Sequence, residues 1–245
     1  MDYNVIKDKY LEYVDSFDQS NDDIKRKRDH SIAVGALAEI LAMELNLDGE
    51  KTKLLKIIGL LHDIGRFEQI AKYSTFRDLI SIDHGDFGVE ILFDDGLIKD
   101  YLNIREYDQI IYDAIKNHNK YKIADNLDKD SLEFAKMIRD LDKIDIYRVA
   151  VEYKDGRLLD KIASEVLNSI YKKESVVWTK ENSQSDETLG MMSFIFDLNY
   201  KESIDILNQN NYFKDYINSI VVSKENREEF EKIKDFIRNN TNLII

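Results

Sequence analysis

The near absence of helix-breaking residues is the feature that most constrains how this chain folds. None of its 245 residues is proline and only nine are glycine. Proline removes a backbone donor and clashes with the preceding helical turn, and glycine lowers helix stability, so a chain almost without both favours helices joined by few tight turns. The sequence therefore predicts an all-α protein, a compact bundle of many helices.

Apolar residues recur at helical spacing along most of the chain. His30, Val34, Leu37 and Leu41 share one helix face. A second helix is predicted from about residue 51 to His62, with Gly65 just past its end. The other predicted helices cover about 85–96, 107–118 and 131–153, a segment after Gly156, and 224–237 behind an N-cap at Ser223, whereas the polar residues 179–190 are predicted to form a loop.

Composition excludes several classes of protein. Hydrophobic residues make up 43% of the chain, which excludes a disordered protein, and the formal charge of -13 argues against a nucleic-acid polymer as partner. The absence of cysteine excludes disulfides, thiolate nucleophiles and cysteine-bound zinc. No stretch approaches the ~18 consecutive apolar residues of a membrane span, and residues 1–10 lack the basic and apolar regions of a signal peptide. We therefore expect a cytoplasmic protein without a membrane partner.

Four histidines are present, and three of them fall on the apolar face of a predicted helix. They are His30, His62, His84 and His118. Neutral imidazole is a common metal ligand, although a single histidine on an apolar face is as well explained as a hydrogen-bonded core residue. Because the predicted surface contributes no histidine at all, the set favours a metal site.

Two aspartates extend this donor set. Asp63 follows His62 directly, and Asp142 falls with Asp145 on the apolar stripe of the helix predicted over 131–153, whereas Asp140 falls off the stripe and is expected to face water. A buried aspartate needs a partner. Asp63, Asp142 and the four imidazoles supply nitrogen and oxygen donors for one or two divalent ions, which suits iron, manganese, nickel or zinc better than calcium, with magnesium as a further option.

The order of these residues resembles the HD-domain superfamily of metal-dependent phosphohydrolases. The stretch "LLHDIG" is similar to the central motif of that family, "RDLDKID" to its terminal aspartate motif, and "DHGDFGVEIL" to a helix of its two-metal branch. The resemblance covers roughly residues 26–148. It implies one metal held by His30, His62, Asp63 and Asp142, and a second metal bridged by Asp63 and held by His84 and His118. The chain departs from related two-metal phosphodiesterases at Asn119, where a second histidine often stands.

The resemblance also implies an activity. It is the hydrolysis of a phosphoester of a nucleotide or a related small phosphorylated metabolite, with a metal-bridged hydroxide as nucleophile. Asp63, Arg66 and Lys143 are then the candidate catalytic residues, and Asp83 is a candidate to orient His84. The candidate substrate-binding residues are Arg66, Arg26, Arg77 and Lys120. A di-iron oxygenase that uses the same ligands and a non-catalytic module that binds metal or nucleotide both stay open.

The domain organisation follows from the extent of the motifs. We predict one HD-type domain over residues 1–245, with its metal-site core at about 26–150. A helical extension at about 185–245 is expected to dock on this core, because so short a segment would bury only a marginal core alone. Nothing in the sequence indicates an oligomeric state.

Overall fold

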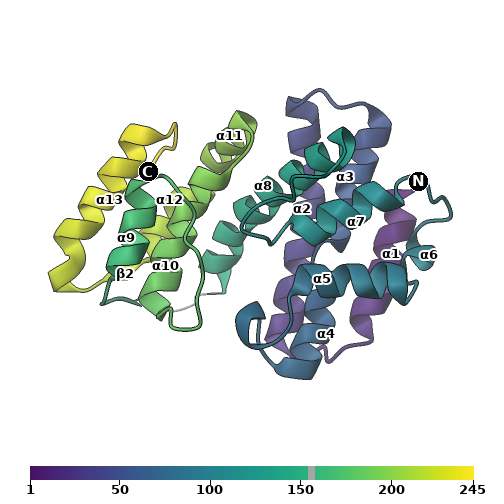
Figure 1. The fold of residues 1–245 in the computed structure, drawn as a ribbon, viewed down its shortest axis with the longest axis horizontal. Coiled ribbons are helices and arrows are strands. Elements are labelled where there is room, and N and C mark those ends of the chain that lie inside the picture. The colour runs from purple at the N-terminus through teal and green to yellow at the C-terminus, as the bar shows by residue number, and fades with distance from the viewer. Residues whose placement is uncertain (154–157) are drawn as a thin grey trace. The chain divides into compact units, whose positions relative to one another are not determined.

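The computed structural model describes residues 1–153 and 158–245, and it is built from helices (Figure 1). Within these ranges the only strands are β1 (Leu158–Leu159) and β2 (Val221–Val222), which pair in parallel with Leu158 opposite Val221. The predicted all-α fold is confirmed. The chain divides into two compact units, residues 1–142 and 143–245, and the boundary falls inside one long helix, α8 (Lys129–Glu152).

The first unit holds the N-terminal helices, purple to teal in Figure 1. Its elements before α8 are α1 (Tyr3–Asp15), α2 (Asp22–Glu44), α3 (Gly49–Leu61), α4 (Ile64–Tyr73), the 3₁₀ turn η1 (Asp78–Ile80), α5 (His84–Val89), the π-helical turn η2 (Glu90–Asp94), α6 (Ile98–Tyr101) and α7 (Asp108–Asn117). The expected face of α2 is confirmed, because His30, Val34, Leu37 and Leu41 are all buried. The long α2 packs along α3 and also contacts α1 and α4.

Local capping explains where these helices begin. The Asn21 side chain accepts from the backbone N–H of Asp23 at the start of α2, and the Asp48 side chain accepts from two backbone N–H groups at the start of α3. The helix predicted over about 85–96 is formed by α5 and η2, and Gly96 follows close to its predicted end. The φ of Gly96 is 85°, a left-handed conformation that glycine adopts readily.

The predicted role of Gly65 is wrong. It does not terminate a helix, because only two residues separate the end of α3 from Ile64 at the start of α4, and Gly65 lies in the first turn of α4. A Cβ atom at Gly65 would lie 2.5 Å from the carbonyl oxygen of His84 and 2.7 Å from the backbone nitrogen of Gly88. The glycine therefore permits α4 and α5 to cross backbone against backbone, which brings the start of α5 close to the end of α3.

The second unit consists of short helices. After β1 come α9 (Ser164–Tyr171), α10 (Gln184–Ser193), the 3₁₀ turn η3 (Phe194–Asp197), α11 (Lys201–Asn210) and α12 (Tyr212–Ser219), and after β2 come η4 (Lys224–Asn226) and α13 (Arg227–Asn240). The buried ring of Tyr147 lies 5.0 Å from that of Phe213 and 5.3 Å from that of Tyr216, between ring centroids. The docking of residues 185–245 on the metal-site core stays a prediction.

Three local predictions for this unit need correction or fall outside the description. The loop expected over 179–190 is helical from Gln184, because Ser183 and Asp186 form a capping box. The N-cap of α13 is Asn226, whereas Ser223 precedes the short turn η4. Gly156 lies outside the described residues, and the helix expected after it begins at Ser164.

Among the described residues, none of the helices has the length and apolar character of a membrane span.

Replacing Gly65 with alanine should lower the free energy of unfolding by about 1–3 kcal/mol, because the new methyl group meets backbone atoms that have no rotamer to change. Urea denaturation followed by circular dichroism measures this. The matched control is Gly49→Ala in the first turn of α3, where a Cβ atom has no neighbour within 4 Å. An equal effect of both substitutions would contradict the close crossing of α4 and α5.

Candidate metal centre

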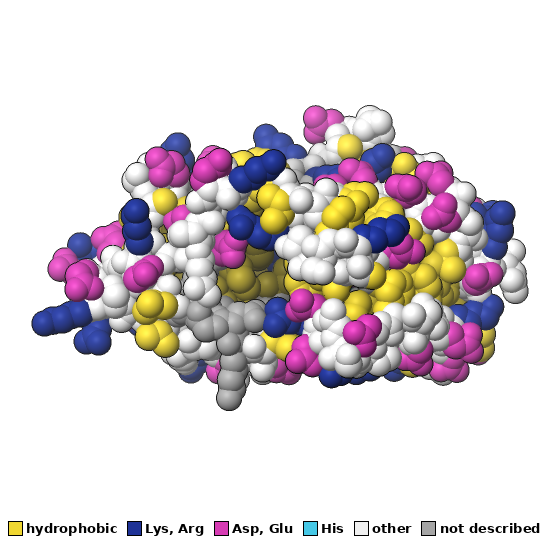
Figure 2. Space-filling view, turned by 90° about the horizontal axis from the view of Figure 1, so that it is seen from below, with side chains coloured by type: hydrophobic (Ala, Val, Ile, Leu, Met, Phe, Trp, Pro, Cys, Tyr) yellow, Lys and Arg dark blue, Asp and Glu magenta, His cyan; other side chains and the backbone are white. Residues whose placement is uncertain are grey.

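The structure brings the six predicted ligands together inside the first unit. They come from separate elements: His30 lies within α2, His62 is the C-cap of α3, Asp63 is the N-cap of α4, His84 begins α5, His118 is the C-cap of α7, and Asp142 lies in α8. All four histidines are buried, and no histidine is visible on the face of the molecule in Figure 2. Each ligand therefore has to reach the centre from its own helix.

The ligands form two groups that share one residue. His30, His62, Asp63 and Asp142 make the first group, and Asp63, His84 and His118 make the second. Within each group the donor atoms all lie within 4.8 Å of one another. This is the spacing that one ion per group requires.

Asp63 faces the two groups with different oxygens. Its Oδ2 lies 3.6 Å from Nε2 of His30 and 3.5 Å from Nε2 of His62. Its Oδ1 lies 3.4 Å from Nε2 of His84 and 3.6 Å from Nε2 of His118. One carboxylate is thus placed to bind an ion on each side.

Hydrogen bonds determine which nitrogen of three imidazoles carries the proton. Nδ1 of His62 donates to the carbonyl of Gly59 at 2.8 Å, and Nδ1 of His118 donates to the carbonyl of Ile115 at 2.6 Å. A carbonyl oxygen only accepts, so in the neutral rings Nε2 holds the lone pair. Nδ1 of His84 donates to Oδ2 of Asp78 at 2.5 Å with the same result.

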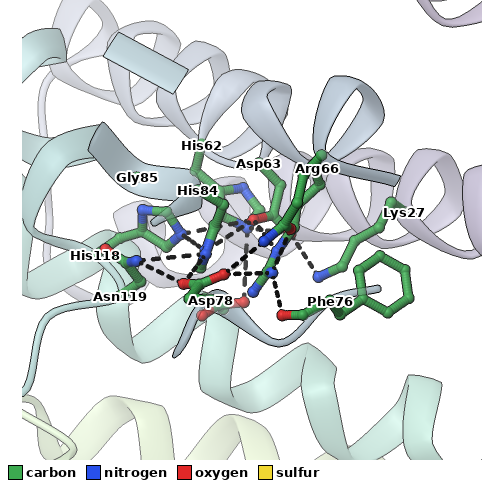
Figure 3. A network of polar contacts seen from close by, with 12 residues as sticks. Lys27, His62, Asp63, Arg66, Phe76, Asp78, His84, Gly85, His118 and Asn119 are labelled. Atoms are coloured by element: carbon green, nitrogen blue, oxygen red, sulfur yellow. Dashed lines mark hydrogen bonds and ion pairs between the residues drawn. The ribbon is translucent and has the colours of Figure 1, made fainter. Parts of the chain in front are cut away.

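The lone pairs of His84 and His118 face one another, with Nε2 of His84 3.0 Å from Nε2 of His118 (Figure 3). Nε2 of His62 lies 3.3 Å from Nε2 of His30, which in turn lies 3.0 Å from Oδ1 of Asp142. Two facing lone pairs need a proton or a metal ion between them. Burial lowers the pKa of His84 to about 4 and also lowers the pKa of His62, so protons are disfavoured near neutral pH. The donor set therefore fits divalent transition-metal ions.

The carboxylates are ionised in spite of their burial. Burial raises the pKa of Asp63, but Lys27 and the neighbouring imidazoles outweigh it and hold this pKa well below the usual range. Burial also raises the pKa of Asp142, but the neighbouring His30 and His62 outweigh it and hold this pKa well below that of a free aspartate. Both side chains are thus available as anionic ligands.

Comparison with known protein families shows which family has this arrangement of residues. The family model for the HD domain matches residues 28–149, a segment that contains all six predicted ligands. Residues 28–149 form an HD domain. HD domains bind divalent metal ions and are generally metal-dependent phosphohydrolases. No curated protein and no solved structure matches the chain.

A residue of the HD domain that the sequence analysis missed, Asp78, supports the second group (Figure 3). Its Oδ2 accepts from His84, and its Oδ1 accepts from Arg66 and Gln69, each at 2.9 Å. Asn119 also donates to Oδ2 of Asp78 at 3.2 Å, so the position that departs from the family pattern holds a supporting residue. Asp78 lies six residues before His84 on a turn, where no helical periodicity marks it.

Asp83 caps the start of α5 and does not contact the ring of His84, which it was a candidate to orient. Its side chain accepts from the backbone N–H groups of Gly85 and Asp86 at the start of α5, and it pairs with Lys120 at 2.6 Å. Asp78, rather than Asp83, makes the contact to the ring of His84. An N-cap at this point orients α5, and through α5 the histidine that begins it.

The predicted cations occupy different surroundings. Nη1 of Arg66 donates to Asp78, to Gln69 and to the carbonyl of Phe76, and its Nε lies 3.7 Å from Oδ1 of Asp63. Lys120 pairs with Asp83 and Asp86. Lys143 pairs with Asp197 at 3.0 Å in the second unit. Of the other two candidates, Arg26 is half-buried and Arg77 is exposed. Their roles toward a substrate stay predictions.

The expectation for Asp140 is wrong. It does not face water but is fully buried, as are Ile138 and Leu141 on other sides of α8. A helix that is covered on several sides has no single apolar stripe, so the stripe does not separate buried from exposed aspartates. Asp145 is buried as predicted, and it pairs with Arg148 at 2.6 Å.

Replacing Asp78 with asparagine should weaken metal binding at the second group by roughly 10- to 100-fold, since the substitution removes the charge that orients His84. Calorimetric titration of the metal-free protein with Mn²⁺ measures both affinities, and the first group should change less. Asp86→Asn is the matched control, because its exposed carboxylate pairs with Lys120 nearby. Unchanged binding in Asp78→Asn would show that the ring of His84 needs no support.

The metal-free protein should lose stability as the pH is lowered from about 6.5 to about 4. Unfolded histidines take up protons near a pKa of about 6.5, whereas the folded protein protonates His84 only near pH 4 and also delays His62. The unfolded state then binds more protons, so the free energy of unfolding falls as the pH falls. Urea titrations in EDTA across this range measure the slope, which His84→Gln should reduce. Constant stability would mean that the folded site takes up protons as readily as the unfolded chain.

Proposed function

We propose that the HD domain of this chain is a two-ion phosphohydrolase that cleaves a phosphoester of a nucleotide or a related small phosphorylated metabolite. The observation that supports this most is the division of one carboxylate between two ligand groups, with Oδ2 of Asp63 toward His30 and His62 and Oδ1 toward His84 and His118. The membership of residues 28–149 in the HD-domain family agrees with it.

The donor set assigns the residues to two ions. His30, His62, Asp63 and Asp142 would hold one ion, and Asp63, His84 and His118 would hold the other. Divalent ions held as a pair lower the pKa of bound water and polarise phosphoryl oxygens, a chemistry that needs neither a serine nor a cysteine nucleophile.

The protein itself orients the ligands and supplies positive charge. The carbonyls of Gly59 and Ile115 and the carboxylate of Asp78 keep the protonated nitrogen of each ring turned away from the centre. Arg66 lies beside Asp63 and has a largely buried guanidinium. A cation at this position favours binding of a phosphate group in a protein whose net charge is otherwise strongly negative.

Metal analysis combined with a substrate panel tests the proposal. Anaerobically purified protein is analysed for Fe, Mn, Ni, Zn and Mg, and then assayed with nucleoside monophosphates, cyclic nucleotides and aryl phosphate esters. We expect metal-dependent release of phosphate or of a nucleotide product. Oxygen consumption with two irons bound and no phosphoester cleavage would contradict the proposal and favour an oxygenase. Tight nucleotide binding without turnover would favour a regulatory module.

Replacing His84 and His118 together with alanine should lower the bound metal from two ions per chain toward one, because the four ligands of the first group remain. Activity should fall further than metal content, since both ions contribute to the same phosphoryl transfer. Mass spectrometry of metals and steady-state kinetics measure the two quantities. Asp63→Asn serves as the comparison and should reduce both sites. Wild-type metal content and turnover in the double variant would show that the second group is structural.

A further inference from the structure

Lys27 lies within the metal centre, although the sequence analysis assigned it no role. Its Nζ lies 2.6 Å from Oδ2 of Asp63, in an ion pair between side chains that are 15% and 2% exposed. Lys27 precedes His30 by three residues on α2, whereas Asp63 begins α4, so this contact depends on the packing of the two helices. Figure 3 shows the ammonium group directed toward Asp63 beside Phe76.

The ammonium group contacts the oxygen that belongs to the first ligand group. Oδ2 of Asp63 is the atom that faces His30 and His62, whereas Oδ1 faces the second group. An ion held by the first group would use the same oxygen. Lys27 therefore opposes an ion at the first group more directly than one at the second.

The charges explain why a cation is needed there in the absence of metal. A buried carboxylate without a partner is costly, and breaking a buried ion pair by removing one side chain is strongly destabilising. Lys27 supplies the compensating charge to Asp63. A divalent ion brings a larger positive charge to the same atom, so it competes with the ammonium group for Oδ2 and repels it.

Phe76 offers the ammonium group a second partner. Nζ of Lys27 lies 5.4 Å from the centroid of the Phe76 ring, and the guanidinium of Arg66 lies 5.6 Å from the same centroid. A cation near an aromatic face is stabilised by the ring quadrupole. The side chain can thus give up its contact with Asp63 without losing every favourable contact.

We propose that Lys27 is a built-in counter-cation of Asp63 that competes with the ion of the first group. It stabilises the metal-free protein and weakens metal binding at His30, His62, Asp63 and Asp142. This inference goes beyond the proposed function, because it concerns the loading of the site with metal and holds for any reaction that the site performs.

The test measures metal affinity and does not depend on turnover. Full-length protein with His84→Ala and His118→Ala retains the first group alone, and it is titrated with Mn²⁺ by calorimetry in low salt after treatment with EDTA. Lys27→Met in this background should tighten Mn²⁺ binding about tenfold or more, because it removes a positive charge next to the ion. Lys27→Gln should act in the same direction.

Two matched variants control for charge and position. Lys25→Met removes the same charge two residues away, where the side chain is 40% exposed and pairs with Asp22, and it should leave the affinity close to that of the parent. Lys27→Arg keeps the charge and should also stay close to the parent. Thermal melts in EDTA should show a lower melting temperature for Lys27→Met than for Lys25→Met, and saturating Mn²⁺ should reduce this difference.

The outcomes separate the inference from its alternatives. Tighter binding in both neutral variants, or a Lys27→Met protein that folds only with Mn²⁺, supports the competition. Affinity equal to that of Lys25→Met, or weaker binding, overturns it and makes Lys27 an ordinary helix contact or a support of the site. A parent that binds no Mn²⁺ also overturns it, because there is then no ion to compete with. Absence of phosphoester cleavage would leave these affinities unchanged and would count against the proposed function alone.

Discussion

The carboxylate of Asp63 is the group on which the rest of the centre depends. Its two oxygens face two pairs of imidazoles, and in each pair the Nε2 atoms point toward one another at 3.0 or 3.3 Å. Such an arrangement is unfavourable without a positive charge, because the lone pairs of His84 and His118 repel each other and burial opposes the protonation of His84 and His62. The centre is therefore organised around cations, whether these are metal ions or the side chains of Lys27 and Arg66.

Helix ends and one close helix crossing make this convergence possible. His62 and Asp63 occupy the junction of α3 and α4, His84 begins α5 and His118 caps α7, so most ligands project from ends, where the chain direction changes. Gly65 lets α4 and α5 approach through their backbones. Without that approach, the ring of His84 would not reach Oδ1 of Asp63, and the second group would lose a member.

The charged side chains around the predicted ligands are of opposite sign and have opposite effects on the binding of a metal ion. Asp78 adds negative charge behind His84, which keeps Nε2 of that ring available as a donor to a metal. Lys27 adds positive charge in front of Asp63, which compensates the carboxylate when no metal is bound. Arg66 joins the two, because it contacts Asp78 directly and lies near Asp63. We therefore expect side chains beyond the six predicted ligands to tune metal affinity in this HD domain.

The sequence by itself determined the helical class and the helix that carries His30, and it predicted the six residues that the structure brings together, because helical periodicity and ligand chemistry can be read from single residues and their spacing. Only the tertiary structure decided that Asp140 is buried, that Gly65 serves a helix crossing, and that Asp78 rather than Asp83 holds the ring of His84. The contact of Lys27 with Asp63 is also a feature that only the tertiary structure decided. These features arise where helices distant in the chain pack together, and the spacing of residues within one helix carries no information about its neighbours.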